Sequence, residues 1–154
     1  MTTAEATPQE LAASVSRTMD VQAITDRLHA YCHAIDHGDS EGWLDCFTED
    51  GSWVVQAVDG NLVFDLHGQG DLRGWIEETH SQNTGGFQHM TLNPRVLTID
   101  GDDAVSTAYY LTSRIVDNIL IMRGTGRYDD RLVRCDDGQW RIKERRISRA
   151  FAYT

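Results

Sequence analysis

Several sequence signals are missing from this chain of 154 residues. No apolar run approaches the roughly 18 residues that cross a bilayer, and the N-terminal residues have neither the basic start nor the apolar core of a secretion signal. Basic residues number 14 against 24 acidic ones, and the net charge of −10 disfavours binding to nucleic acid and to anionic membranes. We therefore expect a soluble, cytoplasmic protein with no nucleic-acid or membrane partner.

Cysteine is also scarce, since the chain has three cysteines and no CxxC pair. Cys32 and Cys46 fall in apolar helical patterns, where a free thiol packs as a small core residue. We expect the cysteines, including Cys135, to be reduced and structural, as suits the cytosol.

The usual signatures of metal, phosphate and nucleophile sites are absent as well. His29, His33 and His37 recur at a spacing that could bind zinc, but there is no HExxH motif and this face lies mostly away from the apolar stripe. We expect a solvated helix face there. The GTG at 124–126 is flanked by strand signals and indicates a bend in a sheet, not a phosphate loop. No metal or organic cofactor is predicted.

The residues that are present indicate one domain in which helices precede strands. Residues 1–19 have few large apolar side chains and form a tail or a peripheral helix, which could begin near Pro8. The main domain, 20–154, opens with Asp20 as the N-cap of a longer helix, whose apolar stripe continues to Ile35. Shorter elements follow: a helix end at Gly38, a short helix capped by Asp39, a turn at 48–51, a strand at 52–58, a hairpin turn at 58–61 and a helix at 69–82.

The second half of the chain is rich in strand signals. Several segments exceed the usual strand length, so we expect bends or bulges in a strongly curved sheet. Helices followed by antiparallel strands predict an α+β fold, with a curved, mostly antiparallel sheet that has helices on one face and surrounds an apolar pocket. The expected strands are 87–99, 104–116, 119–135 and 139–151.

His89 is the histidine best placed for chemistry. Period-two alternation puts Phe87, His89 and Thr91 on one face of the first long strand. An imidazole in an apolar cavity acts as a general base when a carboxylate orients it and stabilises its charged form. The alternative, a half-buried histidine with no catalytic role, stays open at this point.

Asp36 is the candidate carboxylate, because it follows the stripe residue Ile35 at the end of the main helix. A buried carboxylate needs a partner, and an acid at a helix C-terminus opposes the macrodipole, so an imidazolium would compensate both effects. Tyr31 lies five residues earlier, about 140° around the helix from Asp36. Helical geometry therefore leaves Tyr31 either as a core aromatic or as a pocket residue.

Three stretches resemble SnoaL-like proteins, which are relatives of nuclear transport factor 2. They are ITDRLHAYCHAIDHGDSEGWLDCFTEDGSW, FQHMTLNPRVLTIDGDDAVSTAYYL and RYDDRLVRCDDGQWRIKERRI, within about residues 20–150. The resemblance implies a cone-shaped α+β barrel whose pocket is closed by the N-terminal helices. The same fold hosts enzymes, binding modules and assembly partners, so the resemblance alone does not assign a function.

Within that superfamily the chain looks most like three lyases: scytalone dehydratase, bile-acid dehydratase and hexachlorocyclohexane dehydrochlorinase. The resemblance places their shared aspartate on Asp36 and their shared histidine on His89, and the tyrosine of the bile-acid enzyme on Tyr31. The dehydrochlorinase has a pocket tryptophan that falls on Trp53 and an arginine that falls near Arg145.

Other members of the superfamily match less well. Scytalone dehydratase has a second histidine near the place of Arg114, and limonene epoxide hydrolases need an Arg and an Asp where this chain has Tyr109 and Leu111. No residue matches the carboxylate base of ketosteroid isomerases. The small subunits of ring-hydroxylating dioxygenases lack the Asp–His pair, so its presence here favours catalysis.

The resemblance implies a cofactor-independent lyase that removes water from a small, hydrophobic cyclic substrate such as a polyketide or steroid-like molecule. His89 would take a proton next to a carbonyl, Asp36 would hold the imidazole, and Tyr31 would polarise the carbonyl or protonate the leaving hydroxyl. The alternatives are an isomerase or cyclase, and a non-catalytic binding module. A homo-oligomer, trimer or dimer, would cover the exposed sheet face. Candidate substrate-binding residues are Trp53, Phe87, Tyr109, Arg114 and Arg145.

Overall fold

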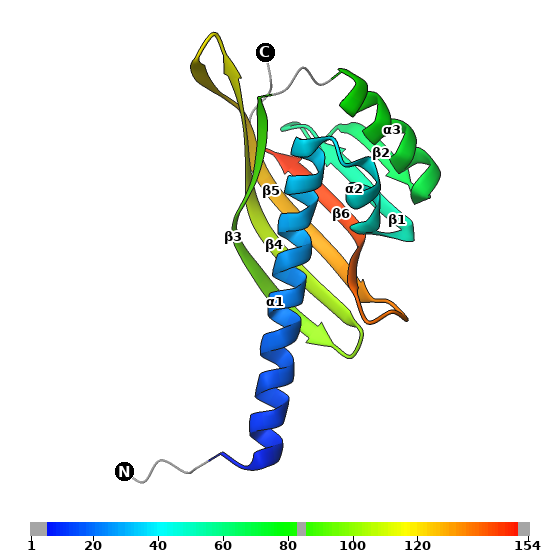
Figure 1. The fold of residues 1–154 in the computed structure, drawn as a ribbon, viewed down its shortest axis with the longest axis vertical. Coiled ribbons are helices and arrows are strands. Elements are labelled where there is room, and N and C mark those ends of the chain that lie inside the picture. The colour runs from blue at the N-terminus through cyan, green and yellow to red at the C-terminus, as the bar shows by residue number, and fades with distance from the viewer. Residues whose placement is uncertain (1–5, 83–85, 151–154) are drawn as a thin grey trace.

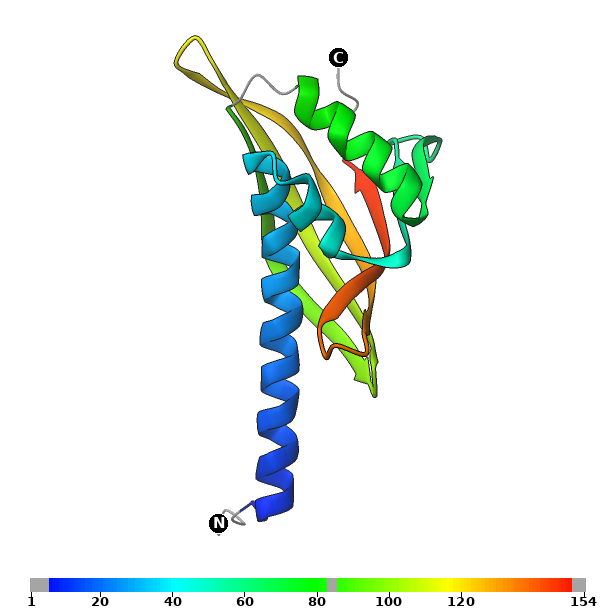
Figure 2. The same ribbon diagram turned by 45° about the vertical axis from the view of Figure 1, so that its right-hand side comes forward.

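The computed structural model describes residues 6–82 and 86–150. One six-stranded sheet, in the order β2-β1-β6-β5-β4-β3, curves around three helices that lie on its concave side (Figures 1 and 2). The elements are α1 (Pro8–His37), α2 (Ser40–Asp45), β1 (Phe47–Gln56), β2 (Leu62–His67), α3 (Gly68–Gln82), β3 (Phe87–Asp100), β4 (Asp103–Val116), β5 (Ile119–Arg134) and β6 (Trp140–Arg149).

Helix α1 is one continuous helix of 30 residues. Thr7 caps its N-terminus in a reciprocal capping box with Glu10, and Pro8 occupies the first turn, where its missing N–H costs nothing. Gly38 ends the helix at φ 73°, a left-handed conformation that glycine adopts without strain. The prediction that Asp20 caps a separate helix is therefore wrong. The helix is capped by Thr7, and Asp20 lies within it.

Asp20 instead fastens the middle of α1 to the sheet. Its carboxylate accepts a hydrogen bond from Trp140 Nε1 at 3.2 Å and pairs with Arg134 Nη1 at 2.8 Å. The Arg134 guanidinium also lies 4.6 Å from the centre of the Trp140 ring. Before Asp20, α1 projects beyond the sheet, as both ribbon views show (Figures 1 and 2).

The shorter elements mostly follow the sequence pattern. Asp39 accepts a hydrogen bond from Gly42 N–H at 2.9 Å, which confirms it as the cap of α2. The hairpin turn near 58–61 and the helix at 69–82 are also confirmed. The turn expected at 48–51 is wrong, because β1 continues through these residues. The turn-forming residues instead cause a register shift in the pairing of β1 with β6, between Phe47 and Ser52.

The long strands of the second half form the curved sheet. All neighbouring strands are antiparallel except β1 and β6, which are parallel. Asp117 and Asn118 both have positive φ, as the tight turn between β4 and β5 requires. Register shifts in β3, β4 and β5 supply the expected bulges, which bend strands of 14 to 16 residues. The α+β fold with a curved, mostly antiparallel sheet is thus confirmed.

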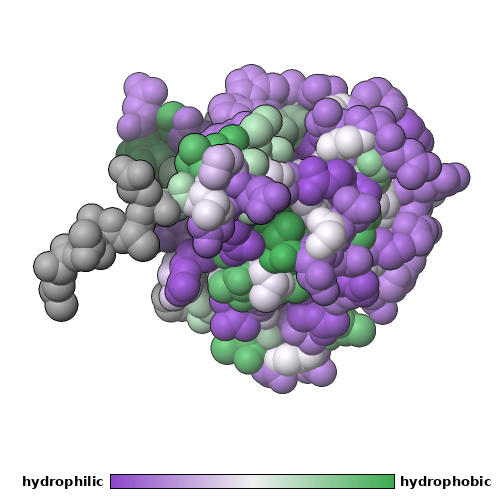
Figure 3. All heavy atoms as spheres, turned by 90° about the horizontal axis from the view of Figure 1, so that it is seen from below, coloured by the Kyte–Doolittle hydropathy of each residue, from purple (hydrophilic) through white to green (hydrophobic). Residues whose placement is uncertain are grey.

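The hydrophobic core fills the space between the helices and the concave sheet face. Cys32 and Cys46 are buried there as free thiols, and Cys135 is a half-buried free thiol. Hydrophilic residues cover most of the end of the molecule seen in Figure 3, where apolar residues form small separate areas. Within residues 6–82 and 86–150, no helix is both long and apolar enough to cross a membrane.

Candidate functional site

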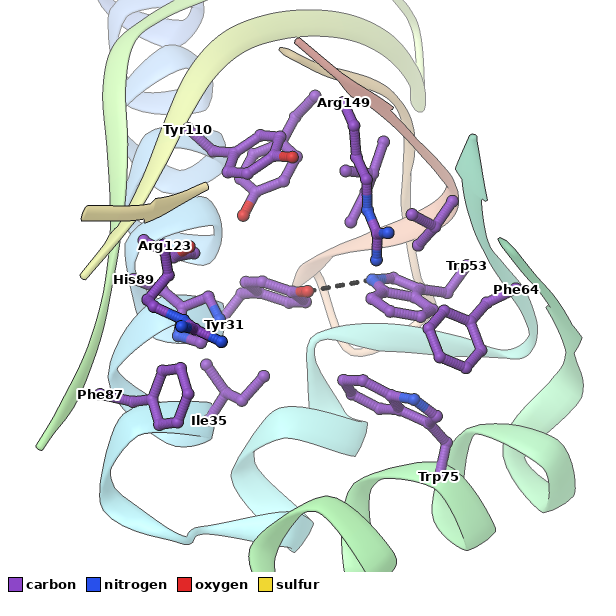
Figure 4. Close-up of a pocket in the computed structure, with 14 residues that line it drawn as sticks. Tyr31, Ile35, Trp53, Phe64, Trp75, Phe87, His89, Tyr110, Arg123 and Arg149 are labelled. Carbon is purple, nitrogen blue, oxygen red and sulfur yellow. Dashed lines mark hydrogen bonds between the residues drawn. The ribbon is translucent and has the colours of Figure 1, made fainter. Parts of the chain in front are cut away.

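A cavity of about 250 Å³ opens between the concave face of the sheet, the C-terminal end of α1 and helix α3 (Figure 4). Its wall is mostly aromatic and is assembled from separate elements, so the tertiary fold alone brings these rings together. An apolar wall with a few convergent polar groups is typical of small-molecule sites. The aromatic wall includes Tyr31, Trp53, Phe64, Trp75, Phe87 and Tyr110.

Asp36 and His89 meet at one side of this cavity. His89 Nδ1 lies 2.6 Å from Asp36 Oδ1, and the backbone N–H of His89 donates to Asp36 Oδ2 at 2.7 Å. One carboxylate therefore fixes both the ring and the main chain of the histidine. An ionised carboxylate only accepts, so Nδ1 is the donor of this bond, and in the neutral form of the imidazole Nε2 is the nitrogen that bears the lone pair. The pair is shielded, with 20% of the His89 side chain and 14% of the Asp36 side chain exposed.

The ends of α1 and β3 are held in place around the pair. His80 of α3 donates from Nε2 to the carbonyl of Ile35, a distance of 3.1 Å, and its Nδ1 lies 2.7 Å from Ser40 Oγ. His80 thus satisfies one of the unpaired carbonyls at the end of α1. On β3 the Phe87 ring stacks on the His89 ring at a centroid distance of 6.4 Å. These contacts restrain the imidazole without using its Nε2.

Tyr31 lies on the floor of the cavity, close to Trp53. The Tyr31 hydroxyl oxygen accepts a hydrogen bond from Trp53 Nε1 at 3.0 Å (Figure 4). Because the indole only donates, this bond leaves the hydroxyl proton of Tyr31 available to a ligand. Burial raises the pKa of Tyr31 to about 12, although the nearby Arg145 guanidinium lowers it. Tyr31 is therefore protonated at neutral pH and suited to donate a hydrogen bond.

Helical geometry left open whether Tyr31 and Asp36 face one pocket. Tyr31 lines the cavity, whereas Asp36 lies behind the wall and reaches it through the His89 ring. Although Tyr31 and Asp36 are about 140° apart around the helix, both therefore contribute to one site, because the His89 ring lies between Asp36 and the cavity.

Arg145 has a different position from the one expected. It was a candidate substrate-binding residue, but its side chain is fully buried and does not line the cavity. Its guanidinium forms a two-fold ion pair with Asp130, at 2.8 and 2.9 Å. It is also sandwiched 4.2 Å from the ring centres of Tyr31 and Tyr128. Arg145 therefore packs against Tyr31 and Tyr128, which line the cavity, and does not itself reach a molecule bound there.

Tyr109 is a second correction. It was expected to form a wall of the pocket, but it is 61% exposed on the other face of β4, while its neighbour Tyr110 is buried and lines the cavity. Arg114 lies outside the cavity lining, with its guanidinium 5.0 Å from the centre of the Phe87 ring. The predicted residues that do line the cavity are Tyr31, Trp53, Phe87 and His89.

Two cationic residues of the lining were missed. Arg149 lies on β6, and the alternation of the strand places it on the face of Arg145 and Ile147, so the sequence pattern could have found it. Arg123 lies on β5, next to the GTG segment that was predicted to bend. A bend in a strand redirects side chains, but the pattern does not say which one.

A second hollow of about 310 Å³ adjoins the first. It shares Ile35, Trp75, Phe87 and His89 with the main cavity and adds Thr79 and Gln82 of α3. His89 thus lies where the two hollows meet, so a molecule in the main cavity can extend past the imidazole along α3.

The histidines on the outer face of α1 do not contribute to this site. His29, His33 and His37 are exposed, and the rings of His33 and His37 stack at 5.9 Å. His37 Nδ1 hydrogen-bonds the carbonyl of His33 at 2.8 Å.

The fold and the cavity define a class of protein in which a single curved sheet and its helices enclose a small, mostly apolar pocket. A family model described as the SnoaL-like domain matches residues 16–146. The chain therefore belongs to the family of SnoaL-like domains. No curated protein sequence matches it.

Solved structures agree with this family. Rv3472 of Mycobacterium tuberculosis, a protein of unknown function, is 29% identical with a TM-score of 0.77 over 90% of this chain and 76% of that one. An NTF2-like protein with a cystatin-like fold from Novosphingobium aromaticivorans is 20% identical, with a TM-score of 0.82 over 98% and 95%. A candidate scytalone dehydratase from the same organism is 19% identical, with a TM-score of 0.74 over 90% and 89%. The last two likenesses show the fold alone.

Proposed function

We propose that this protein is a cofactor-independent lyase, a dehydratase that removes water from a small cyclic ketone or a related carbonyl compound. The observation that carries the proposal is the His89–Asp36 pair at the wall of an apolar cavity, with the Nδ1–Oδ1 distance of 2.6 Å. Within residues 6–82 and 86–150, no group hydrogen-bonds His89 Nε2. The likeness in fold to a candidate scytalone dehydratase is consistent with this chemistry.

The proposed reaction begins with proton abstraction. His89 Nε2 takes a proton from the carbon next to the carbonyl, and Asp36 stabilises the imidazolium that forms. The C–H electron pair forms the new carbon–carbon double bond as the C–O bond to the hydroxyl group breaks. The imidazolium or Tyr31 supplies the proton that turns the departing hydroxyl into water. General acid and base groups of this kind typically contribute about 10²–10⁴-fold each to the rate.

The aromatic wall supports this chemistry by excluding water. In a site of low polarity, the hydrogen bond from Tyr31 to a developing oxyanion is stronger than it would be in water. The Trp53 indole holds the Tyr31 oxygen from one side, so the hydroxyl proton points away from that bond. Tyr31 and His89 both line the cavity, which lets them act on one bound molecule.

Two probes test the proposal at two levels. Exchange of the α-protons of 1-tetralone with deuterium from solvent, followed by NMR, reports the base alone. Conversion of 3-hydroxy-1-tetralone to 1-naphthol, followed by fluorescence and mass, reports loss of water. We expect the wild type to catalyse both, and His89→Gln and Asp36→Asn to lose at least about 10²-fold in each.

His33→Gln is the matched control, because His33 lies exposed on the outer face of α1. It should keep full activity, and circular dichroism should show that all three variants are folded. Retained exchange in His89→Gln or Asp36→Asn would refute the pair as the base. Exchange without loss of water would refute the dehydratase and favour an isomerase or cyclase on the same pair.

A further inference from the structure

The charged side chains that the described residues contribute to the cavity wall are all arginines. Among the described lining residues, Arg123 and Arg149 are cationic and no aspartate or glutamate is present. This is unexpected in a chain of net charge −10, in which acidic residues outnumber basic ones. A concave site lined by one sign of charge attracts ligands of the opposite sign.

Arg123 is directed into the cavity by a β-bulge. Thr112 of β4 pairs with Gly124, and the next residue, Ser113, pairs with Met122, so Arg123 is the extra residue of β5. The buried residues of this strand that follow are the even-numbered ones, from Gly124 to Asp130, and regular alternation would turn Arg123 outward. Bulges of this kind redirect a side chain and are frequent next to functional sites.

The guanidinium of Arg123 lines the cavity without a partner among the described residues. No hydrogen bond or ion pair joins it to any other residue of the part of the chain that the structure describes. The contrast is Arg127, four residues along the same strand, whose Nε pairs with Asp129 at 2.8 Å. An arginine that lines a cavity and is left unpaired presents its planar donor fork to whatever binds there.

The strand register sets the span between Arg123 and the base. His89 pairs with Thr112, which in turn pairs with Gly124, the neighbour of Arg123. Two strand spacings therefore separate the backbones of His89 and Arg123, roughly 10 Å. Both side chains line the same cavity, so one bound molecule can contact the two of them.

From these observations we infer that the substrate carries an anionic oxygen group, a carboxylate or a phosphate, which Arg123 binds while the ring system lies in the aromatic cavity beside His89. The inference rests on the proposed function in one respect, since it takes this cavity as the substrate site. Arg149 lines the same cavity at the β6 side (Figure 4). The planar fork of arginine matches both anions, and the bond is charge-assisted.

Calorimetric titration with three matched probes tests this inference. The probes are 2-naphthoate, 2-naphthyl phosphate and the neutral 2-naphthamide. We expect at least one anionic probe to bind the wild type about five- to tenfold more tightly than the amide at low salt, and the tighter of the two anions identifies the group. The preference should shrink as ionic strength rises, because Arg123 is exposed.

Two arginine variants separate the site from general surface charge. Arg123→Gln should abolish the preference for the anionic probe, whereas Arg127→Gln, which removes the same charge from the same strand, should keep it. Equal affinity of the wild type for all three probes, absence of binding by any of them, or a preference that survives in Arg123→Gln would overturn the inference.

A third variant keeps this inference distinct from the proposed function. His89→Gln removes the proposed base but should retain the anion preference. If both proposals are right, His89→Gln loses catalysis and still binds the anionic probe more tightly than the amide. If the wild type shows no proton exchange on 1-tetralone yet selects the anion through Arg123, the lyase proposal fails and the anion site stands.

Discussion

Tyr31 is the residue on which burial and charge act in opposite directions. Burial raises its pKa from the ordinary 10.0 to about 12, while Arg145 beneath the ring lowers it. In the unfolded chain the phenol ionises near 10, so above that pH the unfolded state binds fewer protons than the folded state. The free energy of unfolding that this group contributes is complete below pH 10 and is lost as the pH rises toward 12.

Tyr31→Phe should make that alkaline loss of stability shallower. The variant cannot ionise at this position, so its free energy of unfolding should fall less steeply between pH 9 and 11 than that of the wild type. Urea unfolding at several pH values measures this slope. Tyr109→Phe, at an exposed position, is the control and should keep the wild-type slope. An unchanged slope in Tyr31→Phe would contradict the raised pKa.

At the residue scale, the sequence predicted the His89–Asp36 pair but only some of the residues that line the cavity. Local features, an apolar strand face and a carboxylate at a helix end, made His89 and Asp36 candidates, and the resemblance to SnoaL-like lyases paired them. The buried face of β4 could not be predicted, since its outward residues, such as Val105 and Tyr109, have larger side chains than the buried Ala104 and Ala108. Side-chain size in β4 therefore favours the wrong face, and only the tertiary packing of the common core decides which side is buried.

At the scale of elements, the contact between Asp20 and Arg134 decides where α1 joins the sheet. The Arg134 guanidinium holds the pKa of Asp20 below its ordinary value, because it hydrogen-bonds the ionised carboxylate. The stability from this pair is therefore present above the ordinary pKa of 3.8 and is lost as the pH falls below it.

Asp20→Asn should lower the free energy of unfolding at neutral pH by about 1–3 kcal/mol, because it weakens a hydrogen-bonded charge pair that is mostly buried. Its stability should also fall less between pH 5 and 3 than that of the wild type. Asp102→Asn is the matched control, since Asp102 bonds the same arginine but is 76% exposed, and should cost about 0.5 kcal/mol or less. Equal losses in the two variants would show that Asp20 is not the anchor.

The same contact explains why the helix start was misjudged. An aspartate before an apolar stripe is a good N-cap signal, and Asp20 meets that description. The partners that give it another role, Arg134 and Trp140, lie more than a hundred residues away in sequence. A pairing at such a distance cannot be inferred from a local pattern, whereas the cap at Asp39 could be, because its partner Gly42 is local.

At the scale of the whole molecule, the turn between β4 and β5 forms an apolar arm. This arm, residues 115–122, extends beyond the helices at the end of the molecule opposite the N-terminus (Figures 1 and 2). Ile119 and Leu120 are 63% and 61% exposed, and Ile115 and Met122 are more than half exposed. Monomeric proteins rarely expose so many adjacent large apolar side chains. We propose that the arm packs against a second copy of this chain, in a dimer or a trimer.

The double variant Ile119→Asp with Leu120→Asp should dissociate the oligomer, because it places charges in an apolar contact. Sedimentation velocity should show the wild type heavier than the 17.4 kDa monomer and the variant at the monomer mass. Leu11→Asp, at an equally exposed apolar position on α1, should leave the mass unchanged. An oligomer that survives the double variant would exclude the arm as the interface.

The projecting part of α1 is a suitable place to attach a label to this protein. Twelve helical residues, 8–19, precede the anchor at Asp20, and at about 1.5 Å per residue they form a stiff rod of about 18 Å. The rod leaves the sheet at the end opposite helix α3 (Figure 1), whose Trp75 lines the cavity. A dye or a surface tether attached near Leu11 would therefore lie far from α3 and the cavity, and single molecules could be immobilised there.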